Sequence, residues 1–243
     1  MASWQPQQAG DTFSTTQWSL IARASADQSS DALLALNELC RCYWEPLHQY
    51  ILRRGHHPED ARDLVQQFFA TFISADFVSR VHPSRGKFRA FLLASLKNFL
   101  INEHLRSTAQ KRGGAIQHVA ADEHSAMGVE GAAQGESFDL QFDREWARLL
   151  LERANQRLAA EYAKGGKAQV FNALKGFLAD VGDERAYAAA GQPVGLSASA
   201  TPVAVCRLRE RYRQYVREEV ASTVTTPEGV NDEMRYLLAV ITT

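Results

Sequence analysis

The sequence has few of the features that mark secreted or metal-binding proteins. Its 243 residues contain three cysteines, Cys40, Cys42 and Cys206. An odd and sparse set of this kind is expected in a reducing compartment. Cys40 and Cys42 form one C-x-C pair, but no second pair of cysteines or histidines follows at the spacing of a zinc site. We therefore interpret the cysteines as buried thiols without a metal or disulfide role.

Long apolar runs and targeting signals are also missing. No stretch of about 18 or more apolar residues occurs, which argues against a membrane-spanning helix. The opening residues MASWQPQQAGDTF have neither the basic start nor the apolar core of a secretory signal, so we expect a cytoplasmic protein. The composition, 45% hydrophobic and 23% charged, is that of a soluble globular protein with one large or two small domains.

Motifs of the common enzyme classes are absent as well. Gly86 and Lys87 lack the upstream glycine of a phosphate-binding loop, because position 81 is valine. His56 and His57 do not have the spacing of a two-histidine zinc motif on a helix. We therefore expect no enzymatic activity, no bound metal and no cofactor.

The apolar residues recur with the 3.6-residue period of a helix along most of the chain. In the first half this period predicts a short helix from Thr15 or Thr16 through Ile21 and longer helices at 31–54, 58–74 and 87–112. Pro46 interrupts the first long helix, so we expect a kink or two abutting helices there. Pro58 suits the first position of the next helix.

The second half has the same period. It predicts helices at 141–163, 167–180, 184–191, from Pro202 to about Val220, and at 227–241. No segment shows the composition and alternation of β-strands. The predicted fold class is therefore all-α.

Residues 113–143 differ from the rest of the chain, because they are rich in Gly and Ala and contain six acidic residues but no Lys or Arg. This composition predicts a linker between two small helical domains. Its negative charge could fold back on a basic face when DNA is absent; the alternative is an unattached acidic spacer. The predicted organisation is a disordered tail at 1–12, a first domain at 13–112, a linker at 113–140, a second domain at 141–220 and a C-terminal extension at 221–243.

The helix predicted at 87–112 concentrates basic charge. From Arg80 to Arg112 the chain has eight Lys or Arg and one acidic residue, although the net charge of the whole chain is −1. Phosphate backbones bind such segments through counterion release. A solvated amphipathic helix is the alternative. The candidate DNA-binding residues here are Lys97, Asn98, Asn102, Arg106, Lys111 and Arg112.

Two other helices have polar stripes. Asp60, Asp63 and Gln67 share one face of the helix at 58–74, a pattern that is also typical of a plain solvated surface. The short helix at 184–191, the following Gly-containing turn and the basic helix after it predict a helix-turn-helix. Its candidate DNA-binding residues are Arg207, Arg209, Arg211 and Arg213.

Three segments carry the motifs of one known family. They are PEDARDLVQQFF at 58–69, FRAFLLASLKNFLINEHLR at 88–106 and YAAAGQPVGLSASATPVAVCRLRERYRQ at 187–214. With them, the chain resembles bacterial RNA polymerase sigma factors of the extracytoplasmic-function (ECF) class over roughly residues 13–220. Such proteins have two helical domains joined by a flexible linker. The first binds the minus-ten promoter element and the polymerase clamp, and the second binds the minus-thirty-five element.

The resemblance implies roles for individual residues. It assigns polymerase binding to Asp60, Asp63, Leu64, Gln66 and Gln67. It assigns the second segment to the minus-ten element, with Phe91 where tryptophan is usual. It assigns the third segment, with its four arginines, to the minus-thirty-five element.

The third segment departs from the family pattern. Gly191 and Pro193 replace a regular helix, and Pro202 lies where the recognition helix begins. Because proline costs about 3 kcal/mol inside a helix but fits the first position, we expect Thr201 to cap the helix and Pro202 to begin it, about one turn late. Since the first turn of a recognition helix usually touches bases, we predict weak or degenerate minus-thirty-five recognition.

The sequence thus predicts a sigma factor that binds core RNA polymerase and promoter DNA and directs transcription initiation. The alternative is a degenerate sigma-like regulator that binds polymerase, DNA or a partner protein without supporting initiation. A plain helix-turn-helix repressor fits less well with two DNA-binding segments on separate domains. The sequence leaves open an anti-sigma factor or a protein kinase as a regulating partner, and we expect no membrane partner.

Overall fold

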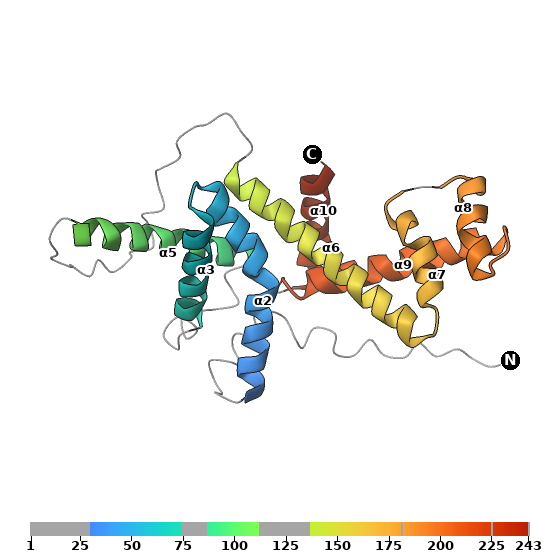
Figure 1. The fold of residues 1–243 in the computed structure, drawn as a ribbon, viewed down its shortest axis with the longest axis horizontal. Coiled ribbons are helices and arrows are strands. Elements are labelled where there is room, and N and C mark those ends of the chain that lie inside the picture. Colours follow the sequence, from blue (N-terminus) through green and yellow to red (C-terminus); the bar gives the residue numbers. More distant parts are fainter. Residues whose placement is uncertain (1–29, 74–86, 112–136, 181, 225, 243) are drawn as a thin grey trace. The chain divides into compact units, whose positions relative to one another are not determined.

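The computed structural model describes five ranges of the chain, residues 30–73, 87–111, 137–180, 182–224 and 226–242 (Figure 1). Every regular element in these ranges is a helix, which confirms the all-α class for the part described. The chain divides into two compact units. The described residues of the first unit are 30–73, 87–111, 137–146 and 223–224, and those of the second are 147–180, 182–222 and 226–242.

The first unit contains α2 (Ser30–Arg53), α3 (Pro58–Phe72), α5 (Phe88–Lys111) and the beginning of α6 (Phe138–Lys164). Pro46 lies inside α2, which is one helix rather than two abutting ones. After α2, Gly55 has a φ of +89°, a left-handed conformation that suits glycine and allows the turn into α3. Pro58 occupies the start of α3, as predicted. The short helix expected between Thr15 and Ile21 lies outside the described residues.

An aromatic cluster forms the core of the first unit. Trp146 of α6 is fully buried and stacks on Tyr43 of α2, with ring centroids 4.4 Å apart and ring planes at 2°. Phe88, at the beginning of α5, packs on both rings. Phe142 meets Tyr50 edge-on. Because Phe142 and Trp146 are four residues apart and share one helix face, the beginning of α6 is part of this core.

Residues 138–146 therefore belong to the first unit, whereas the sequence analysis placed them at the end of the linker and in the second domain. The physical reason is their aromatic pair, which is buried on α2 and α5. At the other end of the chain, α10 (Pro227–Thr242) belongs to the second unit and buries Val230, Leu237 and Val240. No helix in the described ranges is both long and apolar enough to cross a membrane.

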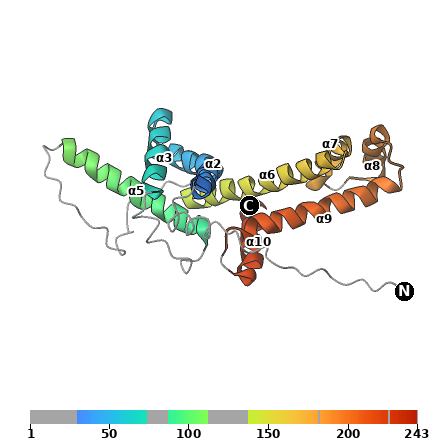
Figure 2. The same ribbon diagram turned by 90° about the horizontal axis from the view of Figure 1, so that it is seen from below.

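The second unit contains the rest of α6 and a series of shorter elements. These are α7 (Ala168–Leu174), η2 (Lys175–Leu178), α8 (Glu184–Gly191), η3 (Gln192–Val194), α9 (Ala200–Ala221) and α10. Buried side chains from α6, α7 and α9 form its core, with Leu158, Phe171, Leu174, Val205 and Leu208 at the centre. Within this unit α6 and α9 lie side by side and run antiparallel (Figure 2). The ion pairs between them show the direction: Arg153 pairs with Glu219, and Glu161, further along α6, pairs with Arg211, which comes earlier in α9.

A tight connection joins α8 to α9. Asp183 caps α8 by accepting a hydrogen bond from the backbone N–H of Ala186 at 2.8 Å. After η3, Gly195 has a φ of +75° and turns the chain. Gly191 lets the two helices approach closely, because a Cβ at this position would lie 1.9 Å from Oγ1 of Thr201.

The expected start of α9 is wrong. The helix begins at Ala200, two residues before Pro202, which lies within the first turn where proline is tolerated. Ser197 supplies the capping contacts: its Oγ accepts from the N–H of Ala200, and its carbonyl oxygen accepts from the N–H of Thr201. The Thr201 hydroxyl donates to the same carbonyl and is buried inside the unit. Thr201 is therefore a packing residue and not the cap.

Candidate functional site

The polar stripe predicted on α3 is exposed. Asp60, Asp63, Gln66 and Gln67 all lie on the solvent side, with Leu64 half-buried at the edge. The opposite face of α3 is buried through Ala61, Val65, Phe68, Phe69 and Phe72. Among the described residues, neither aspartate has an ion-pair partner. These four residues, which we call the α3 stripe, therefore present two carboxylates and two amides to solvent.

The exposed face of α5 combines polar and apolar groups. Asn98, Asn102 and Arg106 are exposed on one side, as the spacing predicts. Arg106 donates a hydrogen bond to Glu103 at 2.6 Å within the same helix. Ile101 and Leu105 are 49% and 55% exposed. The α5 face thus offers hydrogen-bonding groups and apolar surface together. Arg112 and the side chain of Lys111 lie outside the described residues.

Lys97 is different, because it already has an acidic partner. Its ammonium group lies 2.6 Å from a carboxylate oxygen of Asp139, at the beginning of α6. One turn further along α6, Asp143 forms a buried ion pair with Arg89 of α5. Both acidic residues come from the segment interpreted as an acidic linker. Most of that segment, residues 113–136, lies outside the described residues, so the hypothesis that its negative charge folds back on a basic face stays a prediction.

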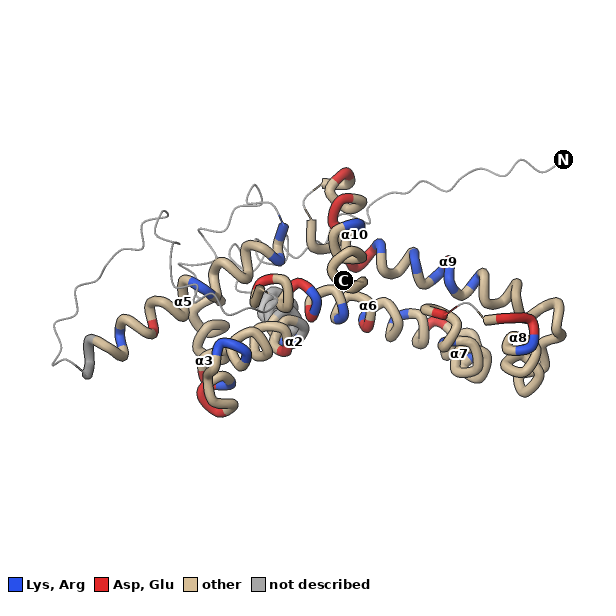
Figure 3. The backbone as a smooth tube through the Cα atoms, turned by 90° about the horizontal axis from the view of Figure 1, so that it is seen from above, with Lys and Arg blue, Asp and Glu red and all other residues tan. Residues whose placement is uncertain are grey.

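The arginines of α9 divide into two groups. Basic residues follow one another along the helix (Figure 3). Of the four arginines predicted to bind DNA, Arg207 and Arg213 are exposed, whereas Arg209 and Arg211 are partly buried. Arg209 turns back into its own unit. It donates through Nε to the carbonyl oxygen of Phe177 at 2.7 Å and through Nη2 to that of Asp180 at 2.6 Å. Arg209 thus links α9 to the end of η2 and to Asp180, in the segment that precedes α8.

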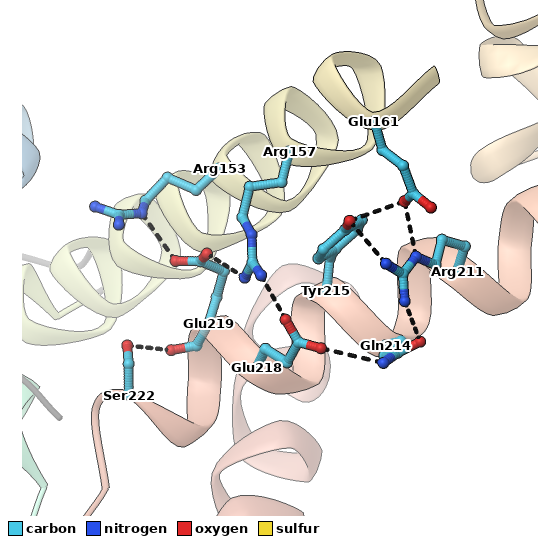
Figure 4. Close-up of polar contacts among 9 residues, drawn as sticks. All are labelled: Arg153, Arg157, Glu161, Arg211, Gln214, Tyr215, Glu218, Glu219 and Ser222. Carbon is cyan, nitrogen blue, oxygen red and sulfur yellow. Dashed lines mark hydrogen bonds and ion pairs between the residues drawn. The ribbon is translucent and has the colours of Figure 1, made fainter. Parts of the chain in front are cut away.

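Arg211 also makes its contacts inside the unit (Figure 4). Its Nε lies 2.7 Å from Glu161 of α6, and its other nitrogens donate to Gln214 and to the hydroxyl of Tyr215. The hydrogen bond from Arg211 lowers the pKa of the Glu161 carboxyl, and a second hydrogen bond from Tyr215 lowers it further. The Arg211 guanidinium therefore links α9 to α6.

A second set of ion pairs extends this link toward the end of α9 (Figure 4). The buried carboxylate of Glu219 accepts from Arg153 at 2.8 Å and from Arg157 at 2.9 Å. The guanidinium of Arg157 also lies 4.4 Å from the ring centroid of Tyr215, within the range of a cation–π contact. Several charged groups thus hold α6 and α9 in one register.

The outward face of α9 includes residues that the sequence analysis did not select. Val203 is 50% exposed, and Cys206 and Glu210 are exposed beside Arg207. The prediction that the cysteines are buried is therefore wrong for Cys206, because it lies on the side of α9 opposite the core. Helical period predicts that Val205, Leu208 and Val216 face inward, and their burial confirms it.

Among the described residues, no group of three His, Cys, Asp or Glu side chains is placed to hold a metal ion.

Comparison with known proteins gives one match. Residues 39–111 match the family model of sigma-70 region 2, so the α3 stripe and the α5 face both lie within the matched segment. Neither the curated proteins nor the solved structures gave a match. The matched segment, 73 of the 243 residues, is thus similar to region 2 of sigma-70 factors. Sigma factors are not enzymes, in agreement with the expectation from sequence.

Proposed function

We propose that this protein is an ECF-class sigma factor that binds core RNA polymerase, directs it to promoters and acts in the cytoplasm. The observation that carries the proposal is the exposed α3 stripe within a matched sigma-70 region 2 segment. Asp60 and Asp63 present carboxylates on a rigid helix whose other face is anchored in the aromatic core. Such a surface suits a basic partner, because complementary charges speed association and select the partner.

The α5 face is proposed to bind the minus-ten element. Asn98, Asn102 and Arg106 offer amides and a guanidinium to phosphates and base edges. Ile101 and Leu105 supply apolar surface next to these groups, on which an unstacked base could pack. We propose that Lys97 joins the contact after its pair with Asp139 opens.

The second unit is proposed to act as a region 4-like helix-turn-helix. The support is local: a capped α8, a left-handed turn at Gly195, and α9 with an exposed outer face. The weak minus-thirty-five recognition predicted from the sequence rested on a late start of α9. Because α9 begins at Ala200, that reason no longer applies.

Binding to purified bacterial core polymerase tests the proposal. We expect the full-length protein to bind, and Asp60→Arg/Asp63→Arg to lower the affinity by about tenfold or more, because two attractive charges become repulsive. The matched control is Glu228→Arg/Asp232→Arg, an equal charge change on the exposed side of α10. Equal binding by all three proteins would reject the α3 stripe as the polymerase contact.

The alternative is a sigma-like regulator that binds polymerase without supporting initiation. It is favoured by the extent of the family match, which covers 39–111 and none of the second unit. Run-off transcription separates the two functions. A regulator of this kind would bind core polymerase through the α3 stripe and yield no transcript from any promoter in a random library.

A further inference from the structure

A hollow in the second unit is large enough to hold a small molecule. Its volume is about 320 Å³, which is at the lower end of the range for small-molecule sites in proteins. Residues of three elements line it, namely α6, η2 and α9. None of the residues proposed to bind polymerase or DNA is among them. The hollow is therefore a feature that the proposed function does not explain.

Apolar side chains form the more buried part of the lining. They are Leu151 of α6, Leu178 of η2 and the ring of Tyr212 of α9, all half-buried. The Tyr212 hydroxyl donates to the carbonyl oxygen of Leu151 at 3.2 Å, so the ring is held between α6 and α9. Burial, and after it the negative charge of Glu152, raises the pKa of this hydroxyl, which therefore stays neutral at pH 7. The inner part of the hollow is thus apolar and uncharged.

Polar and charged side chains form the rim. Arg148, Glu152 and Lys175 are exposed there, two positive charges and one negative charge. The Glu152 carboxylate accepts a hydrogen bond from Gln156 at 3.1 Å. Lys175, at the beginning of η2, forms no ion pair with another described residue, and the half-buried Asn155 amide has no hydrogen-bond partner among them. The rim thus offers an ammonium group and an amide to an anion.

The η2 wall of the hollow is held in place by α9. Arg209 donates to the carbonyl oxygens of Phe177 and Asp180, which lie on either side of Leu178 in the chain. Gly176 is part of the same wall, and no atom lies within 4 Å of a Cβ added to it, so the space beside it is open. Because the walls are already ordered, a ligand loses little affinity to their ordering.

We propose that this hollow binds a small organic anion, a molecule with an apolar body and one carboxylate, sulfonate or phosphate group. The body packs on Leu151, Leu178 and Tyr212, and the anionic group bonds the Lys175 ammonium and the Asn155 amide. An inorganic anion would leave the apolar part of the lining in water, and a neutral apolar molecule would gain nothing from the charge of the rim. Since the ligand contacts α6, η2 and α9 together, it stabilises the folded second unit.

The test uses two fluorescent probes with the same aromatic body, anilinonaphthalene sulfonate and the uncharged phenylnaphthylamine, titrated into the full-length protein. We expect the wild type to bind both and to prefer the anionic probe. Lys175→Gln should lower the affinity for the anionic probe by about two- to fivefold, as for one exposed charge pair, and leave the affinity for the neutral probe unchanged. The matched control is Lys164→Gln, an equal charge change at an exposed lysine that does not line the hollow. It should leave both affinities unchanged.

Filling the hollow provides a second readout. Gly176→Phe should weaken the binding of both probes by at least about tenfold, because its ring takes the open space beside this position. Gly176→Ala should keep most of the binding. Circular dichroism checks the helix content of each variant; if Gly176→Phe does not fold, the comparison of the two lysine variants decides alone.

Three results would overturn the inference. They are a wild type that binds neither probe or has no preference for the anionic one, equal affinities in Lys175→Gln and Lys164→Gln, and unchanged binding by a folded Gly176→Phe. Probes bound elsewhere, such as at the exposed Ile101 and Leu105, would give the last two results. The inference does not rest on the proposed function, because these measurements need neither polymerase nor DNA.

Discussion

Asp139 holds its carboxylate 2.6 Å from the ammonium group of Lys97, so an acidic residue at the beginning of α6 pairs with a cation on α5, the helix proposed to bind DNA. Next to it, Asp143 forms a buried pair with Arg89, and Glu145 lies 3.0 Å from Arg53 of α2. Three acidic residues in seven positions thus contact three basic residues of the first unit. If α5 binds DNA as proposed, the DNA competes with Asp139 for Lys97.

The Lys97–Asp139 pair gives the first prediction. Asp139→Asn should raise the affinity for DNA of random sequence up to about fivefold at low salt, because the Lys97 charge becomes available. Both side chains are more than one third exposed, so the loss of stability should stay below about 1 kcal/mol. Fluorescence anisotropy with labelled DNA measures the gain. In Asp139→Asn/Lys97→Gln the gain should vanish; a gain that persists there would rule out Lys97 as its source.

Trp146 gives a prediction about the first unit. Trp146→Ala should lower the free energy of unfolding by about 3–5 kcal/mol, because it removes a fully buried ring stacked on Tyr43. Urea denaturation measures the change. Phe138→Ala is the control, since this aromatic side chain lies two turns earlier on α6 and is 45% exposed. Similar effects of the two substitutions would show that residues 138–146 are not anchored through Trp146.

Much of the fold follows from helical period, because each predicted helix in the described ranges has one apolar face to bury. Helical period does not show which polar side chains bond to other parts of the same unit. Arg207, Arg209, Arg211 and Arg213 looked equivalent in the sequence, but Glu161 and the carbonyl oxygen of Phe177 are more than 30 residues away and turn two of them inward. A single sequence gives no direct sign of such long-range partners.

The beginning of α6 was missed for a different reason. Its acidic residues continued the composition of the preceding Gly- and Ala-rich segment, so Asp139 was assigned to the linker. The better signal was the spacing of Phe138, Phe142 and Trp146, four residues apart, which marks a helix face. At α9, the preference of proline for the first helical position led to the prediction that Pro202 begins the helix. The capping side chain is Ser197 instead.

Gly191→Ala should change the stability in the direction opposite to that expected from helix propensity. Alanine normally stabilises a helix by up to about 1 kcal/mol relative to glycine. Gly191→Ala should instead destabilise the second unit by about 1–3 kcal/mol, because the new methyl group would overlap Oγ1 of Thr201. Thermal unfolding measures the change. Gly176→Ala, where no atom lies within 4 Å of the added Cβ, should be near neutral. A stabilising Gly191→Ala would contradict the close approach of α8 and α9.

Glu161 gives a prediction about pH. Its pKa is lowered in the folded protein, mainly by the hydrogen bond from Arg211. A carboxyl of this kind contributes stability above its unfolded pKa, and this contribution is lost as pH falls through the lower folded pKa. Stability measured between pH 7 and pH 3 should therefore decline less steeply in Glu161→Gln than in the wild type. The difference should be below about 1 kcal/mol, because both side chains of the pair are more than one third exposed. Glu210→Gln, which removes a carboxylate without an ion-pair partner among the described residues, should keep the wild-type decline. An unchanged profile in Glu161→Gln would contradict the role of the Glu161–Arg211 pair.

The most direct test of the sigma factor proposal is run-off transcription by core polymerase with and without the full-length protein, on a library of random promoter sequences. A sigma factor should give transcripts that depend on the added protein, begin at defined positions and are strongly reduced by Asp60→Arg/Asp63→Arg. Polymerase binding without any protein-dependent transcript would contradict the sigma factor proposal and support the regulator that binds without initiating.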